Sequence, residues 1–98
     1  GTASAVIGAG LGGKVKIIAY DADPQQVRDL KDGVYDALVV QSPYLEGYDS
    51  VKLVTQILRG EVDPATLEDV AYPPMVVATR DNLDSPEVAK SLYVDACP

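Results

Sequence analysis

The sequence predicts an α/β fold built around one strand–helix–strand unit. Residues 14–20 and 34–41 are short segments rich in β-branched and aromatic residues, a composition typical of buried strands. Between them, residues 24–32 have the start and stop signals of a helix. A strand, a tight helix and a second strand almost always form a right-handed parallel crossover. We therefore expect an α/β fold with a parallel β-α-β core.

The helix at 24–32 is marked at both of its ends. Asp23 is a good N-cap, Pro24 suits the first helical position, and Gln26 completes a capping box. Gly33 follows the last helical residue, and glycine is the usual terminator of a helix. These signals predict that the chain turns sharply on either side of a short helix.

The second strand and the helix after it continue the same pattern. The apolar run at 37–40 is continuous rather than alternating, which predicts a strand covered on both faces. Ser42 and Pro43 then provide a second cap and proline, so we expect a long helix from about Tyr44 to Arg59. Outside this unit we expect a helix end and glycine turn at 1–13 and a capped turn at 63–68. We also expect short strands at 70–72 and 75–79 and a last helix at 85–93.

Length and composition exclude several classes of protein. A chain of 98 residues and 10.4 kDa has room for one small core. With 15 acidic and 8 basic residues the net charge is −7, which argues against a nucleic-acid partner. No apolar run approaches the roughly 20 residues that span a bilayer. No charged-then-apolar leader opens the sequence.

Enzymatic chemistry finds little support. Histidine is absent, and the single cysteine, Cys97, is next to last, so neither a His-activated nucleophile nor a His-ligated metal is available. The glycines of 8–13 match G-x-G-x-x-G, but a strand pattern follows Gly13 where a dinucleotide fold requires a helix. We therefore expect no enzyme and no cofactor, and we interpret the glycines as a helix end and a turn.

Two polar residues form the most specific pattern. Asp21 follows the first strand, and Gln41 ends the second strand 20 residues later. Both should lie at the carboxyl ends of adjacent parallel strands, where ligands bind in open α/β sheets. An ionised Asp accepts hydrogen bonds, and a Gln amide both donates and accepts, which suits an uncharged polyol such as a sugar.

Other roles for these residues stay open. Asp21 could brace the turn before Asp23, and Gln41 could be an ordinary strand end. Asp21 and Asp23 could instead hold Mg²⁺, as in phosphate-accepting receiver domains. That chemistry also needs a third acidic residue and a nearby Lys, no Lys occupies such a place, and Asp23 is better used as the helix cap. The tyrosines can stack on sugars, but core-like spacing favours packing roles for Tyr20, Tyr35, Tyr44 and Tyr48. Tyr44 is the exception that could face a ligand, because it follows Gln41 by only one helix entry.

The segments KVKIIAYDADP (14–24) and GVYDALVVQSP (33–43) resemble the C-terminal part of the ribose-type sugar-binding proteins of ABC transporters, the type 1 periplasmic binding proteins. Residues 47–48, the helix end at 58–60 and the segment 77–82 share the resemblance. It implies that Asp21 and Gln41 hydrogen-bond sugar hydroxyls, and that Gln41 lies at a hinge strand between two lobes. The implied fold is an incomplete C-terminal lobe of the three-layer, Rossmann-like kind, and the implied ligand is a monosaccharide.

The resemblance also implies that the chain is a C-terminal fragment. Residues 1–98 would be one fragment, with 1–41 in the C-terminal lobe, 42–60 as the helix after the hinge, and 70–82 as strands crossing back. The expected partners are the missing N-terminal lobe, a membrane permease and, because one helix face is left uncovered, a second copy of the fragment. The implied location is periplasmic or extracellular, with lipoprotein anchoring as an option. The alternative is the effector-sensing domain of a lac-repressor-type regulator, which shares this fold.

Overall fold

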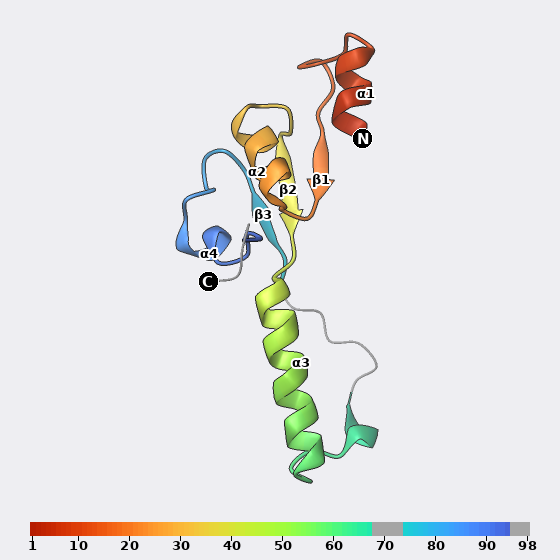
Figure 1. Cartoon of the computed structure of the whole chain (residues 1–98), viewed down its shortest axis with the longest axis vertical. Helices are drawn as coiled ribbons and strands as arrows, with labels where there is room; N and C mark the ends of the chain where they lie inside the picture. The colour runs from red at the N-terminus through yellow and green to blue at the C-terminus, as the bar shows by residue number, and fades with distance from the viewer. Residues whose placement is uncertain (68–73, 95–98) are drawn as a thin grey trace.

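A mixed three-stranded sheet with helices on one face forms the centre of the protein (Figure 1). The computed structural model describes residues 1–67 and 74–94. In chain order the elements are α1 (Thr2–Gly8), β1 (Ile18–Tyr20), α2 (Pro24–Lys31), β2 (Ala37–Val40), α3 (Pro43–Leu58), the 3₁₀ turn η1 (Pro64–Thr66), β3 (Val76–Ala78) and α4 (Pro86–Ala89). The strand expected at 70–72 and Cys97 lie outside the described residues.

The strands lie in the order β1-β2-β3. Strand β1 pairs with β2 in parallel, with Ile18 opposite Ala37 and Tyr20 opposite Val39. Strand β3 pairs with β2 antiparallel, with Val40 opposite Val76. The predicted α/β class and its strand–helix–strand unit are therefore confirmed, and α2 starts with the predicted capping box.

Both parallel strands are shorter than the sequence pattern predicts. The expected strand at 14–20 begins only at Ile18, because the N–H groups of Lys14 and Val15 donate to Leu11 in the turn after α1. The expected strand at 34–41 is reduced to Ala37–Val40. At this end of the sheet the Asp36 carboxylate accepts from the Ile17 N–H at 2.9 Å, so a side chain replaces a ladder carbonyl.

The core lies on one face of the sheet, beneath α2 and α4. Leu30, Leu38 and Val40 are fully buried, and Ala78 and Val88 complete the contact with β3 and α4. On the opposite face, four apolar side chains are more than half exposed: Ile18, Tyr20, Met75 and Val77. The prediction that 37–40 is covered on both faces is thus wrong for this chain, since Ala37 and Val39 are only half-buried.

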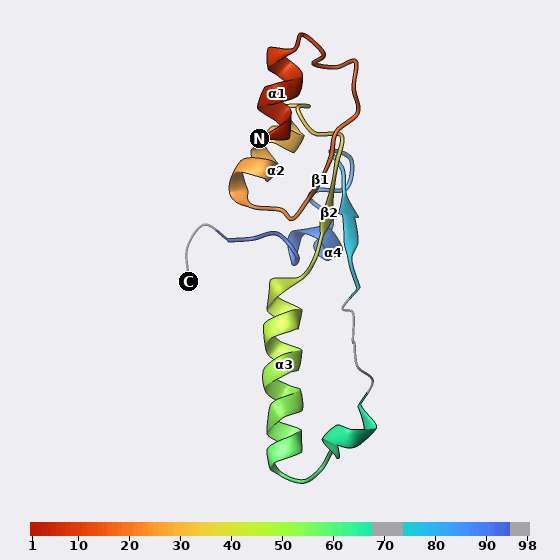
Figure 2. The same cartoon turned by 90° about the vertical axis from the view of Figure 1, so that its right-hand side faces the viewer.

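Helix α3 extends away from the sheet along the 58 Å long axis of the molecule (Figure 2). Its predicted start is confirmed, because the Ser42 hydroxyl accepts from the Leu45 N–H. None of its residues is buried, and Tyr44 and Tyr48 stack on each other at the surface. The predicted core role is therefore wrong for both, and for the exposed Tyr20, whereas Tyr35 packs against the core. Within the described ranges, no helix has the length and apolar character that crossing a membrane requires.

Candidate ligand site at the strand ends

Asp21 and Gln41 stand side by side at the carboxyl ends of β1 and β2. The Asp21 N–H donates to the Val39 carbonyl at 2.9 Å, which extends the parallel pairing one residue past β1. Asp21 then turns the chain with φ +73°, a left-handed conformation that Asp tolerates better than most residues. Gln41 follows β2 directly, so the crossover through α2 brings two residues 20 positions apart into contact.

A hydrogen-bonded cluster of three side chains results. The Gln41 Nε2 donates to Asp21 Oδ1 at 2.9 Å, and the Tyr93 hydroxyl donates to the same oxygen at 2.8 Å. A longer bond of 3.4 Å runs from Gln41 Nε2 to the Tyr93 hydroxyl oxygen. The structure therefore brings the two predicted site residues together, while their role toward a ligand stays a prediction.

Tyr93 is the member of the cluster that the sequence pattern does not predict. The pattern places Tyr93 at the end of the last helix, but α4 stops at Ala89 and the chain continues to the loop after β1. There the Tyr93 N–H donates to the Ala22 carbonyl at 3.2 Å. Tyr93 lies 72 positions from Asp21, and no strand or helix periodicity links two residues so far apart. Only the general affinity of tyrosines for polar ligands could have pointed to it.

The protonation of Tyr93 is set by its neighbours in the cluster. Donation from Gln41 lowers the pKa of the hydroxyl, but burial, the bond to Asp21 and the charges of Asp21 and Glu46 together raise that pKa above its ordinary value. The raised pKa favours the protonated hydroxyl, which donates to Asp21. An open cleft of about 710 Å³ adjoins Gln41 and Tyr93, and Tyr44 and Lys90 also line it.

The magnesium site and the dinucleotide site that the sequence could also suggest do not match this geometry. Asp23 Oδ1 accepts from the N–H groups of Gln25 and Gln26. This carboxylate therefore caps α2 instead of pairing with Asp21 in a metal site. The glycine motif begins at the end of α1, and positive φ angles at Gly10 and Gly13 turn the chain toward β1. No helix begins at these glycines, so they lack the N-terminal amides that would hold a pyrophosphate.

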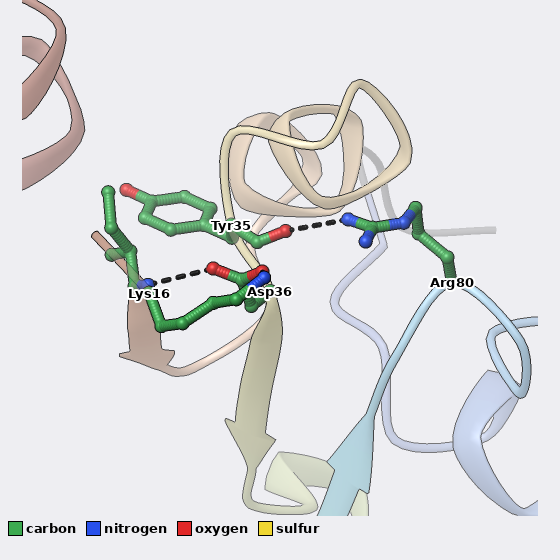
Figure 3. A network of polar contacts seen from close by, with 5 residues as sticks. Lys16, Tyr35, Asp36 and Arg80 are labelled. Carbon is green, nitrogen blue, oxygen red and sulfur yellow. Dashed lines mark hydrogen bonds and ion pairs between the residues drawn. The ribbon is translucent and has the colours of Figure 1, made fainter. Parts of the chain in front are cut away.

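The opposite end of the sheet is closed by a polar network (Figure 3). Lys16 pairs with Asp36 at 2.8 Å, and Arg80 donates to the Tyr35 carbonyl at 3.1 Å. The bond from Lys16, the Ile17 N–H and the charges of Lys16 and Arg80 hold the pKa of Asp36 below its ordinary value. These charged side chains form bonds within the protein itself. They lie at the ends of the strands opposite to Asp21 and Gln41.

The carboxylate of Asp21 and the amide of Gln41 lie at the carboxyl ends of parallel strands, which is where open α/β sheets bind their ligands. The family model for the periplasmic binding protein domain matches residues 1–62. The chain therefore belongs to this family. A comparison with curated protein sequences finds no significant relative.

Solved structures extend the similarity over nearly the whole chain. An ABC transporter solute-binding protein from Agrobacterium vitis with bound D-fucose is 32% identical, with a TM-score of 0.79 over 93% of this chain. A second one from the same organism, bound with α-D-tagatopyranose, is 29% identical, with a TM-score of 0.80 over 96% of this chain. A carbohydrate transporter solute-binding protein from Agrobacterium radiobacter with D-arabinose is 30% identical, with a TM-score of 0.76 over 93% of this chain. The chain spans 30% of the length of each of these proteins.

Proposed function

We propose that the chain is part of a solute-binding protein that captures a monosaccharide for an ABC-type uptake system. The observation that carries this proposal is the contact between the Asp21 carboxylate and the Gln41 amide at the ends of two parallel strands. Family membership and the three sugar-bound structures support it. No observation favours the alternative, an effector-sensing domain of a transcription regulator.

The chemistry of the two residues fits sugar hydroxyls. A carboxylate only accepts hydrogen bonds, so the Gln41 group that faces Asp21 must be its NH₂, and the carbonyl Oε1 of Gln41 is left as an acceptor. Sugar hydroxyls donate to such acceptors, and each bond to the charged Asp21 contributes about 1.5–3 kcal/mol. In the proposed protein these residues hold one side of the sugar while two lobes close around it.

The same proposal gives the other expected partners. A second, N-terminal lobe supplies the remaining sugar contacts and covers the apolar side of α3, whose residues are all outside the core. A membrane permease receives the sugar, and the protein works in the periplasm or outside the cell, where a lipid anchor is one way of holding it. By itself, the 98-residue chain associates with a second copy through the uncovered apolar surfaces.

Calorimetry on a full-length protein that carries this chain tests the proposed function. The probes are D-fucose, D-tagatose and D-arabinose, followed by the other common pentoses and hexoses. We expect Asp21→Gly, which removes the carboxylate and suits the positive φ, to weaken the tightest of these sugars about ten-fold or more. Asp21→Asn, which removes the charge and replaces one acceptor oxygen with an NH₂ donor, should also weaken it.

The matched control is Asp81→Asn. Asp81 is exposed in the turn after β3, at the other end of the sheet, so its loss should leave sugar affinity unchanged. Binding of none of the sugars by the unaltered protein would reject the proposed function. Equal affinity in the Asp21 variants and the unaltered protein would reject the assignment of Asp21.

A further inference from the structure

We infer that Tyr93 is a positioning residue of the sugar site, because its hydroxyl fixes which carboxylate oxygen of Asp21 faces the ligand. The inference rests on the proposed function and adds a residue from the C-terminal segment to it. Tyr93 and Gln41 both donate to Oδ1 of Asp21, at 2.8 and 2.9 Å. Among the described residues, Oδ2 receives no side-chain or backbone donor.

The hydrogen-bonding capacity of the cluster explains what this arrangement does. The single proton of Tyr93 is used on Asp21, and both N–H groups of Gln41 are directed to Asp21 and Tyr93. The groups that remain, Oδ2 of Asp21 and Oε1 of Gln41, are both acceptors. The site therefore selects a ligand that brings two hydrogen-bond donors, such as two neighbouring sugar hydroxyls.

Two backbone bonds hold the cluster in this state before a ligand arrives. The Tyr93 N–H donates to Ala22 at 3.2 Å, and the Asp21 N–H donates to Val39 at 2.9 Å. The neighbour of Tyr93, Leu92, packs against the core, which ties the segment after α4 to the sheet. The carboxylate is thus oriented by packing and hydrogen bonds, so less conformational entropy is lost when the sugar binds.

The test is Tyr93→Phe in the full-length protein that carries this chain, measured by calorimetry with the tightest-binding monosaccharide of the panel described above. Phe keeps the ring and the backbone bond to Ala22 and loses only the hydroxyl bond to Asp21, so we expect no more than a small fall in the melting temperature. We expect the sugar affinity to fall about five- to thirty-fold, because only the Gln41 amide then holds the orientation of the Asp21 carboxylate. Tyr35→Phe is the matched control: it removes a tyrosine hydroxyl at the other end of the sheet and should leave affinity unchanged.

A double-mutant cycle separates positioning from a general structural role. In an Asp21→Asn background, Tyr93→Phe should change the affinity less than about two-fold, since no carboxylate is left to orient. A loss of the same size in both backgrounds would overturn the inference in favour of a packing role. Unaltered affinity of the single Tyr93→Phe variant would also overturn it. Absence of sugar binding by the unaltered protein would reject the proposed function instead.

Discussion

At the scale of single residues, the site is organised around one carboxylate oxygen. Asp21 Oδ1 accepts from Gln41 and Tyr93, which come from the end of β2 and from the segment after α4. Charge-assisted bonds of this kind are stronger than neutral ones, and here two of them converge on the same atom. The cluster therefore links the first strand of the chain to its C-terminal segment.

Tyr93 should titrate above the ordinary tyrosine value of about 10. Since folding raises this pKa, the bond to Asp21 stabilises the fold fully below pH 10, and this contribution is lost as the pH rises through the folded-state pKa. The measurement is ¹³C NMR of ring-labelled tyrosine, with the signal assigned through Tyr93→Phe. In Asp21→Asn the raised pKa should move back toward 10, and an unmoved titration would show that Asp21 is not its cause.

At the scale of elements, the helix starts are where sequence and structure agree best. Asp23 Oδ1 accepts from two backbone N–H groups of α2, and the Gln26 side chain returns a bond to the Asp23 N–H at 2.9 Å. Such caps depend on residues within one turn of each other, so the sequence contains all the information they need. The sequence predicts the strand ends less well. The N–H groups that would lengthen β1 donate instead to the Asp36 carboxylate and to the turn after α1.

Removing the α2 cap gives an element-scale prediction. Asp23→Ala leaves two N–H groups of the first turn without their acceptor and should lower the free energy of unfolding by about 1 kcal/mol. Asp23→Asn retains a capping oxygen and should cost less. Urea unfolding of the full-length protein measures both. Sugar affinity should stay unchanged in each variant, and a large loss of affinity would show that Asp23 takes part in the site.

At the scale of the whole molecule, many large apolar side chains lie outside the small core and are exposed. Val51, Val54 and Leu58 of α3 are between 55 and 82% exposed. The outer face of the sheet adds Ile18 and Val77, at 68 and 54%. Exposed apolar side chains gathered on one helix and one sheet face are typical of interfaces, so we expect the fold to need a partner lobe or a second copy.

This exposure predicts concentration-dependent association of the 98-residue chain. Sedimentation velocity should show a rising average mass as the concentration increases, because pairing buries the apolar side of α3. Val51→Glu with Leu58→Glu should shift the chain toward the monomer, since both positions are exposed and neither belongs to the core. A monomer at every concentration in the unaltered chain would contradict the prediction.

The sequence by itself determined the features that depend on neighbouring residues or on one crossover. These are the capped start of α2, the span of α3, and the meeting of Asp21 with Gln41. Tertiary structure alone decided the third member of the site, because only packing brings Tyr93 to a residue 72 positions away. It also decided that Tyr44 and Tyr48 are exposed, since helical spacing shows that residues share a face but does not show what covers that face.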